Sequence, residues 1–523
     1  MKQASRIKEL FARRIFFKDV TVFDAAALGG VFIVYATLAL STITKFSIWF
    51  DEAFSAYIAR FDFWQIAVYT AHDVQPPLYY WLLKLWSLLF GSSELALRSL
   101  SVVLGSVAIV FAYLLVRRLF NRYAALLSIF FMILSPLFIR YSQEARMYML
   151  VVAIALAATY ALVVALQTKR KKAWVGYGIL VALGMWVHYL TALVWLANIV
   201  WHAFDVWQRG QKWKQFKEVF FAKEWVSAYG LAVLLYLPWI PAFLLQTAIV
   251  QVAGFWIPPI TAETLPNFIS NVFLFREIDS VASWFSVWLL LATLIGCVGT
   301  WRVYRHTDQR RFLGLLVVMV IVPVALLLLV SLPPLRPVFI DRYLMTSALV
   351  VPILIGISIA AARVKVHFKI AAILLVAGIF LVGSLHVWEI GNYNKNTQLS
   401  NNTRQVIDAI YSHGKVGQPI IADSPWLFYE GVFYAKPEHP VYFLNASIQY
   451  PYGSLEMLKQ NEQFKIHDLA IFMKEHDSFW YMSTLTEGEQ NPPISGLREV
   501  QEIVIDDAVS GRPLYRAVEY TAQ

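Results

Sequence analysis

Long apolar runs recur along this chain, and they restrict what it can fold into more than any other feature. A helix that crosses the hydrocarbon core of a bilayer needs about 20 mostly apolar residues. Eleven runs of suitable length precede residue 390, namely residues 24–44, 99–116, 123–139, 147–167, 173–189, 190–206, 226–245, 283–300, 312–330, 343–361 and 370–388. The sequence therefore predicts an α-helical polytopic membrane protein with about 11 transmembrane helices.

The composition excludes a soluble globular enzyme, and the charge pattern argues against a nucleic-acid binder. Only 15% of the residues are charged, against about 25% in ordinary soluble domains. The net charge of +10 would suit nucleic acid only if the cations gathered on one soluble face. Instead, 25 Lys and Arg residues lie in alternate loops on one side of the predicted membrane, and nine lie in the loops on the other side.

This uneven distribution predicts the orientation, because short cytoplasmic loops are enriched in Lys and Arg. The cation-rich stretches are residues 2–18, 117–122, 169–172, 209–223, 302–311 and 363–369. We therefore expect a multi-pass protein of the cell membrane with a cytoplasmic amino terminus and an extracytoplasmic tail. The net charge is then a consequence of topology, and no nucleic-acid partner is predicted.

One apolar segment is too short to cross the membrane. Residues 78–91 are apolar apart from Lys84, and a run of about 14 residues is typical of re-entrant or interfacial helices. A crossing here would also move every later loop to the other side and reverse the cation bias. Residues 45–98 are therefore predicted to form one long outer loop with aromatic-rich interfacial helices.

The tail after Trp388 is polar and alternates helical with strand-like patterns. Helices are predicted at 403–413 and 424–435, and strands at 419–423, 441–445, 479–484, 500–506 and 513–520. This order predicts a small α/β domain. The expected division is a membrane-embedded domain at residues 1–390 and an extracytoplasmic domain at residues 391–523.

Ionisable groups gather at the outer ends of the apolar runs, where they are costly unless a cavity holds them. Asp51 and Glu52 directly follow Trp49 and Phe50 at the start of the outer loop. Two interpretations are open for this acid pair. It is either functional, or two solvated carboxylates at the membrane surface.

A second polar group, His72, Asp73 and Gln75, precedes two prolines in HDVQPP. Prolines exclude a regular helix and hold the residue before them in extended geometry. The motif either aims His72 or Asp73 at a fixed point or makes a rigid turn before the interfacial helix.

The third group lies in RYSQEARMY, residues 140–148, and contains Glu144, Arg146 and Tyr148. Glu144 and Arg146 form either a local ion pair with a helix cap or an anion site, because a guanidinium fork suits bidentate binding of phosphate. His188 and Arg342 lie at two other outer ends and are candidates to join Arg146.

Several chemistries leave no sign in the sequence. It contains no GxxxxGK[ST] loop, no HExxH, no CxxC and no Asp-x-Asp, and its single cysteine, Cys297, lies inside an apolar run. No cofactor is predicted, and a divalent metal stays open without being indicated. An enzyme on the outer face would use a donor that the membrane already carries.

Three segments together resemble a known family. They are FDEAFSAYIA at residues 50–59, HDVQPPLYYWLLKLWSLLFGSSELALRSLS at residues 72–101 and YSQEARMYML at residues 141–150. They are similar to polyprenyl-phosphate-sugar-dependent glycosyltransferases of the C-type membrane fold, in particular the group of protein O-mannosyltransferases and lipid A aminoarabinose transferases. The likeness in motifs covers about residues 45–150, and the likeness in hydropathy extends to about residue 390.

The resemblance implies a role for each candidate. Asp51 would activate the acceptor, Glu52 would organise the acceptor or the site, and Arg146, with Arg342 and His188, would bind the donor phosphate. The other acceptor-binding or site-organising candidates are His72, Asp73, Gln75, Glu144 and Tyr148. Aminoarabinose transferases carry a lysine where this chain has Gln75, and the luminal modules of eukaryotic protein mannosyltransferases are missing, so neither of those two activities is implied.

The expected reaction moves a sugar from a polyprenyl-phosphate carrier to an acceptor hydroxyl on the outer face, with inversion. Because the carrier phosphate is a good leaving group, one base and one cation suffice, whereas a glycosidase needs two carboxyl groups. The expected partners are the lipid-linked donor, membrane lipids and an acceptor that is a lipid, a glycan or a protein. The alternative function is a transporter or flippase of a lipid-linked saccharide, although midplane charges are scarce and no internal repeat is visible.

Overall fold

The computed structural model of the chain forms two compact units. It describes residues 21–208, 213–253, 257–278, 281, 283–307, 309–391, 402–444, 457, 462–485, 496–507 and 509–522. The helix unit takes the described residues of Met1–Ser41, Ser99–Pro241 and Phe255–Trp388, and the loop–sheet unit takes those of Thr42–Arg98, Ala242–Gly254 and Glu389–Gln523. The predicted boundary at residue 390 stays a prediction, and the amino-terminal cations at residues 2–18 lie outside the described residues.

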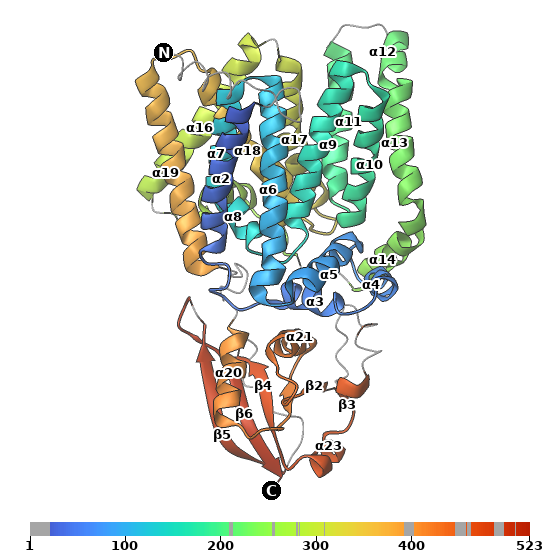
Figure 1. Ribbon diagram of the computed structural model, residues 1–523, viewed down its shortest axis with the longest axis vertical. Helices are drawn as coiled ribbons and strands as arrows, with labels where there is room; N and C mark the ends of the chain where they lie inside the picture. Colours follow the sequence, from blue (N-terminus) through green and yellow to red (C-terminus); the bar gives the residue numbers. More distant parts are fainter. Residues whose placement is uncertain are drawn as a thin grey trace. The chain divides into compact units, whose positions relative to one another are not determined.

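The helix unit is a bundle of long helices that stand side by side (Figure 1). Its helices are α2 (Val22–Leu40), α6 (Glu94–Leu119), α7 (Arg122–Leu134), α8 (Pro136–Ser142), α9 (Tyr148–Thr168), α10 (Lys171–Val187), α11 (Thr191–Gln208), α12 (Trp213–Phe220), α13 (Lys223–Tyr236), α15 (Thr264–Leu274), α16 (Ser283–His306), α17 (Arg310–Val330), α18 (Met345–Ala361) and α19 (Val366–Ile390). The 3-10 turns η1 (Leu237–Trp239) and η3 (Asp341–Leu344) precede α14 (Ile240–Ala253) and α18. Most of α14 and the first turn of α6 belong to the loop–sheet unit.

Among the described residues, eight helices are long and apolar enough to cross a membrane, or nine if the bent pair α7 and α8 is one span. The chain is therefore a multi-pass membrane protein. Each of the eleven predicted runs coincides with a helix or a broken helix, but α10 and α11 are not among the eight, so the number eleven stays a prediction. The pair bends by 63° where Pro136 opens α8, because proline lacks the N–H that would continue the helix.

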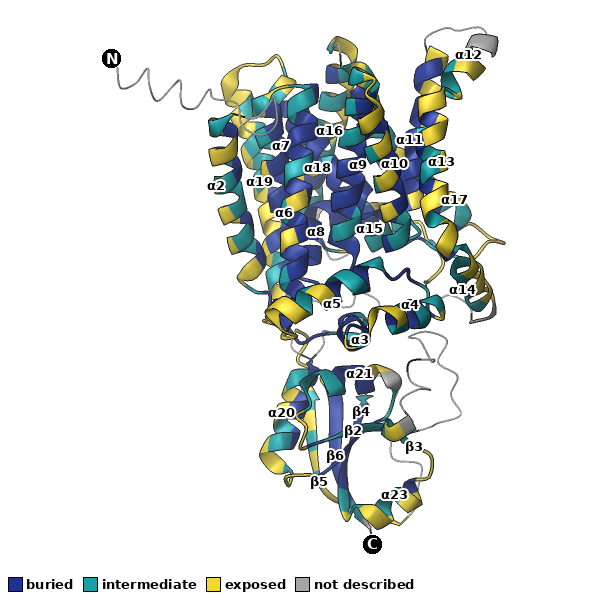
Figure 2. Ribbon diagram, turned by 45° about the vertical axis from the view of Figure 1, so that its right-hand side comes forward, coloured by how far each residue is buried: buried dark blue, intermediate teal, exposed yellow. Residues whose placement is uncertain are grey.

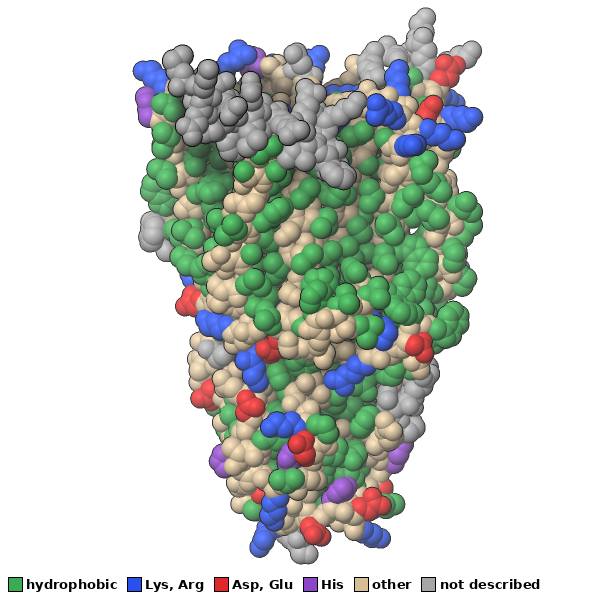
Figure 3. Space-filling model, viewed as in Figure 1, with side chains coloured by type: hydrophobic (Ala, Val, Ile, Leu, Met, Phe, Trp, Pro, Cys, Tyr) green, Lys and Arg blue, Asp and Glu red, His purple; other side chains and the backbone are tan. Residues whose placement is uncertain are grey.

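The outer surface of the helix unit suits lipid rather than water. Large apolar side chains face outward on different helices, including Ile33, Leu234, Ile321 and Leu374, whose exposed fractions lie between 58% and 70%. Figure 3 shows a broad band of hydrophobic side chains over the helices, with Lys and Arg side chains gathered at its upper edge. Such a band is expected where the bilayer core contacts the protein.

Different hydrogen bonds join the helices at the two ends of the bundle. At one end, the buried carboxylate of Asp24 in α2 accepts hydrogen bonds from Tyr113 Oη (2.6 Å) in α6 and from Arg122 Nε (2.7 Å) in α7. At the other end, Tyr35 Oη of α2 donates to Ser142 Oγ (2.6 Å), and the Gln143 amide donates to the Ala39 carbonyl (2.8 Å). The bend after α8 therefore lies at the end of the bundle opposite Asp24.

The loop–sheet unit joins helices of the outer loop to a six-stranded sheet. The loop contains α3 (Phe50–Ile58), α4 (Phe63–Ala71) and α5 (Leu78–Phe90). The sheet consists of β1 (Ile420–Ala422), β2 (Val441–Leu444), β3 (Lys465–Ile466), β4 (Ser478–Thr484), β5 (Leu497–Asp506) and β6 (Pro513–Ala522) in the order β3-β2-β1-β4-β6-β5. Strands β1 to β4 pair in parallel, and β6 pairs antiparallel with β4 and β5.

The helices of the tail are α20 (Thr403–His413), α21 (Pro425–Tyr434) and α23 (Leu469–Glu475). Both predicted tail helices and all five predicted strands coincide with described elements, whereas β3 and α23 were not predicted. Ile421, Phe479 and Val518 lie in the hydrophobic core that packs against the sheet. Figure 2 shows that β4 and β6 are buried and that the edge strand β5 is more exposed. The position of α3 to α5 at the outer membrane surface stays a prediction.

Candidate active site

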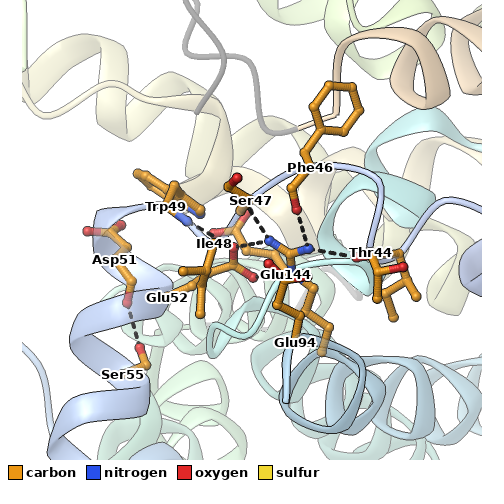
Figure 4. A network of polar contacts seen from close by, with 12 residues as sticks. Thr44, Phe46, Ser47, Ile48, Trp49, Asp51, Glu52, Ser55, Glu94 and Glu144 are labelled. Atoms are coloured by element: carbon orange, nitrogen blue, oxygen red, sulfur yellow. Dashed lines mark hydrogen bonds and ion pairs between the residues drawn. The ribbon is translucent and has the colours of Figure 1, made fainter. Parts of the chain in front are cut away.

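Asp51 lies in the first turn of α3 with its side chain partly exposed. Its backbone carbonyl accepts a hydrogen bond from Ser55 Oγ (2.7 Å), one turn later in the helix. Figure 4 shows the side chains of Asp51 and Glu52 pointing away from each other, although the two residues are adjacent. The Asp51 carboxyl therefore points away from the buried contacts of its neighbour.

Glu52 is buried, with 1% of its surface exposed, and forms a bidentate ion pair with Arg98 of α6. Arg98 Nε and Nη2 lie 2.8 and 2.7 Å from the two carboxylate oxygens. The other guanidinium N–H groups bind the carbonyls of Ile43 (2.6 Å), Phe46 (2.9 Å) and Ser47 (3.0 Å). All five donors of Arg98 are thus used, and the pair fixes the segment that leads into α3.

The residues of the HDVQPP motif have three different environments. His72 is exposed, and its Nδ1 lies 2.9 Å from the Val68 carbonyl of its own helix, α4. Asp73 is buried and interacts electrostatically with Tyr429 of α21; burial, Tyr57 and Asp73 together raise the pKa of the Tyr429 hydroxyl well above its ordinary value. The motif ends where α5 begins, as a rigid turn would.

Gln75 of the same motif is buried, and its carbonyl accepts a hydrogen bond from Gln246 Nε2 of α14 at 3.2 Å. The same amide nitrogen donates to the Thr70 carbonyl at 2.5 Å. These contacts fix the backbone of the turn, and the roles of His72, Asp73 and Gln75 toward an acceptor stay predictions.

In the helix unit, the third polar group that the sequence indicates, residues 140–148, spans the bend between α8 and α9. Arg140 Nη1 lies 2.7 Å from Glu144 Oε2, and both side chains are largely buried. The Glu144 carbonyl accepts hydrogen bonds from Ser101 Oγ (2.5 Å) and from the Arg146 backbone N–H (2.8 Å). Glu144 therefore forms a local ion pair with Arg140, whereas the ion pair that the sequence left open would join Glu144 to Arg146. The Glu144 backbone carbonyl holds Arg146 in place.

Arg146, His188 and Arg342 come together from three distant segments. His188 lies in the short turn between α10 and α11, and Arg342 lies in η3. Both arginines are close enough to His188 to interact with it electrostatically. The His188 ring also lies 6.3 Å from the ring of Tyr148 and 5.5 Å from that of Tyr343, between centroids. The structure thus assembles the three predicted phosphate-binding residues at one end of the bundle, together with Tyr148.

The hydrogen bonds of His188 identify its tautomer. The Leu190 backbone N–H donates to His188 Nδ1 at 3.1 Å, so Nδ1 carries a lone pair and the proton of the neutral ring resides on Nε2. Nε2 is buried and has no hydrogen-bond partner among the residues that the structure describes. A buried N–H donor beside two guanidinium groups forms a region that favours an anion.

A large apolar cavity of about 760 Å³ lies in the same unit, between α11, α15, α16, α17 and α18. Its lining includes α17 residues from Arg310 at the start of that helix to Leu328 in its last turn. At about 1.5 Å per residue, this stretch approaches the thickness of the hydrocarbon core. Among the described residues, no group of three or more His, Cys, Asp or Glu side chains could hold a metal ion.

Asp51 belongs to the loop–sheet unit, and Arg146, His188 and Arg342 belong to the helix unit. Their meeting in one pocket stays a prediction. Sequence reasoning gave no role to Arg98, although it lies inside one of the three family-like segments and four residues after Glu94. That i, i+4 spacing would have paired Arg98 with Glu94, whereas Arg98 binds Glu52 and Glu94 binds Arg404.

A family model matches part of the chain. Residues 74–241 match the model of a family described as dolichyl-phosphate-mannose-protein mannosyltransferase. This stretch contains Gln75, Glu144, Arg146, Tyr148 and His188. A comparison with curated protein sequences finds no match.

Solved structures share the fold over most of the chain. ArnT from Cupriavidus metallidurans bound to undecaprenyl phosphate aligns with a TM-score of 0.62 at 11% identity, over 95% of this chain and 98% of that one. Its apo form gives 0.61 at 12% identity, over 94% and 98%. Arabinofuranosyltransferase AftD from Mycobacteria gives 0.50 at 13% identity, over 95% of this chain and 41% of that one. At such low identity, these likenesses show the fold alone.

Proposed function

We propose that this protein, a C-type membrane glycosyltransferase by its family match and its fold, moves a sugar from a polyprenyl-phosphate carrier to an acceptor hydroxyl on the outer face of the cell membrane. The observation that carries the proposal is the convergence of Arg146, His188 and Arg342 at one end of the helix bundle. The acceptor is a lipid, a glycan or a protein, and the sugar is a hexose or a pentose.

The donor phosphate binds at these three residues. Two guanidinium groups and the Nε2–H of His188 can together donate several charge-assisted hydrogen bonds to phosphate oxygens. As the bond between the anomeric carbon and the phosphate oxygen breaks, negative charge grows on the departing phosphate. Donors that already point at that charge stabilise the transition state, so no general acid is required.

Asp51 supplies the general base. Its carboxylate accepts the proton of the acceptor hydroxyl while the acceptor oxygen attacks the anomeric carbon from the face opposite the phosphate, which inverts the anomeric centre. Glu52 acts as a positioning residue, because its bidentate pair with Arg98 occupies both carboxylate oxygens. General-base assistance contributes about 10² to 10⁴ in rate.

The apolar cavity beside α17 suits the isoprenoid chain of the donor, because its lining is mostly apolar and extends along most of that helix. The proposed orientation places the carboxyl-terminal domain outside and the amino terminus in the cytoplasm, as the Lys and Arg distribution favours. The outer location matches a donor carried by the membrane rather than by a nucleotide.

The direct test incubates purified protein with a radiolabelled prenyl-phosphate sugar and membranes of the producing cell. We expect labelled sugar to pass to membrane material while free prenyl phosphate accumulates in equal amount. The same reaction with Arg146→Lys should need a higher donor concentration, because lysine keeps the charge but loses the fork. Movement of intact donor across vesicles without release of prenyl phosphate would indicate the transporter instead.

A further inference from the structure

The segment that leads into α3 is held by a second arginine, which comes from the carboxyl-terminal domain. Arg404 of α20 places Nη2 2.5 Å from Glu94 Oε2, 3.0 Å from the Thr44 carbonyl and 3.4 Å from the Phe46 carbonyl. Its backbone N–H donates to Ser47 Oγ at 3.2 Å. The Phe46 carbonyl thus faces guanidinium groups of both Arg98 and Arg404. Figure 4 labels Thr44, Phe46, Ser47 and Glu94 beside the segment that leads into α3.

Tyr434, at the end of α21, completes the contact. Its hydroxyl donates to Glu94 Oε1 and accepts a hydrogen bond from the Ile48 backbone N–H at 2.6 Å. Both oxygens of Glu94 are therefore bound by residues of the tail, and Glu94 itself is the first residue of α6. The held segment, residues 44–48, ends three residues before Asp51.

A cluster of aromatic rings fixes the helix that carries Asp51. Phe50, Phe54 and Tyr57 lie at i, i+4 and i+7, so they share one face of α3. On that face, Tyr429 of α21 lies 6.1, 5.8 and 5.1 Å from their ring centroids, respectively. These contacts oppose rotation of α3 about its axis, and rotation would move Asp51.

We propose that Arg404 and Tyr434 are positioning residues for Asp51, and that the carboxyl-terminal domain is in this way a part of the acceptor side of the site. The inference rests on the proposed function, because it requires Asp51 to be the base. Arg404 and Tyr434 act through Glu94 and the backbone of residues 44–48 and do not contact substrate. A displacement of about 1 Å at a reacting group can cost about 10²-fold in rate. Loss of the contacts that hold residues 44–48 should therefore lower kcat.

The test compares kinetic constants of Tyr434→Phe, Arg404→Ala and the control Arg512→Ala, which removes an exposed arginine from the turn between β5 and β6. We expect kcat to fall about 10-fold for Tyr434→Phe and about 10- to 100-fold for Arg404→Ala. The KM for the donor should change less than about 2-fold, because the phosphate-binding residues lie in the other unit. The control should match the wild type. Unchanged kcat in Tyr434→Phe and Arg404→Ala, or an equal loss of donor affinity, would overturn the proposal.

Two further variants separate positioning from folding. Arg404→Lys keeps the charge beside Glu94 and should recover part of the lost kcat, whereas Arg404→Met, which is similar in size, should not. In an Asp51→Glu background, where the carboxylate is already displaced, Arg404→Ala should lower kcat by a smaller factor than it does in the wild type. Equal factors in the two backgrounds would mean that Arg404 does not act through Asp51, which contradicts the proposal.

The same measurements separate failure of this inference from failure of the proposed function. If Asp51→Asn transfers sugar at the wild-type rate, the general base is wrong and the inference falls with it. If Asp51→Asn loses transfer while Arg404→Ala and Tyr434→Phe keep it, only the inference is contradicted.

Discussion

Two adjacent carboxylates on α3 differ in ways that their sequence does not show. Glu52 is buried and uses both oxygens to bind Arg98, whereas Asp51 is partly exposed and points the other way. Both carboxylate oxygens of Glu52 bind Arg98, whereas the Asp51 carboxyl points away from that ion pair. For this reason we propose Asp51 as the base and Glu52 as a positioning residue.

Replacing the proposed base gives the first prediction. Asp51→Asn removes the proton acceptor with little change in size, so kcat should fall about 10²- to 10⁴-fold while the protein remains in the membrane at normal abundance. The matched control is Asp62→Asn in the same loop, because asparagine caps α4 as well as aspartate does. Wild-type transfer by Asp51→Asn in the prenyl-phosphate release assay would remove Asp51 from the mechanism.

The tautomer of His188 gives the second prediction. His188→Phe keeps a ring but loses the Nε2–H donor, whereas His188→Gln retains an N–H group on a flexible side chain. A hydrogen bond to a charged group is worth about 1.5–3 kcal/mol, so the donor KM should rise roughly 10- to 100-fold in His188→Phe and clearly less in His188→Gln. Equal donor binding by both variants and the wild type would show that His188 does not contact the phosphate.

At the residue scale, the sequence predicted which types of residue form the site but not their partners. Arg146, His188 and Arg342 were identified because ionisable groups are unusual at the ends of apolar runs. Arg404 and Tyr434 were not, because they lie in a polar tail where such residues are ordinary, and their partner Glu94 is more than 300 residues away in the chain. Contacts over such distances depend on the fold and leave no local pattern.

At the scale of elements, apolar runs predicted the helices well because lipid requires every backbone group to be paired inside a helix. Two helices that match predicted apolar runs, α10 and α11, are not among the candidate spans. α11 carries Asn198 and Asp205, which bind Tyr177 of α10 (3.1 Å) and Arg311 of α17 (2.9 Å). These polar pairs explain why α11 is not among the candidate spans by composition and yet packs within the bundle.

The cavity beside α17 gives the third prediction. Gly314 lies in its lining, and an added Cβ would meet only Tyr304 and Trp201, at 3.7 and 3.9 Å, so alanine fits there. Gly314→Phe should fill the cavity and raise the KM roughly 10-fold for a donor with a long isoprenoid chain, with little effect on a short-chain donor. Gly314→Ala is the control and should behave as the wild type. If Gly314→Phe affects both donors equally, the chain does not occupy this cavity.

At the scale of the whole molecule, the resemblance to C-type membrane glycosyltransferases agrees with a family match over residues 74–241 and with a fold shared over 95% of the chain. The resemblance also implied roles for single residues, and these stay predictions. The predicted orientation rests on the distribution of 25 and nine cations between the two sides. It concerns the membrane rather than the fold, so it needs a measurement in cells.

The fourth prediction tests that orientation. The chain has a single cysteine, so Cys297→Ser provides a background for labelling. In intact cells, a membrane-impermeant maleimide should label Arg512→Cys in the carboxyl-terminal domain but not Arg170→Cys between α9 and α10. Both positions are exposed, and both should react once the membrane is opened. The reverse pattern would place the carboxyl-terminal domain in the cytoplasm.

The central claim is that a carboxylate of one unit and the cations of the other flank a single substrate. An experimental structure with a non-cleavable prenyl-phosphonate sugar bound tests this most directly. We predict that the phosphonate lies within about 3 Å of Arg146 and His188 Nε2, and that the Asp51 carboxylate faces the anomeric carbon from the opposite side, with room for one hydroxyl between them. A phosphonate bound away from these cations, or an Asp51 more than about 10 Å from the anomeric carbon, would contradict the claim.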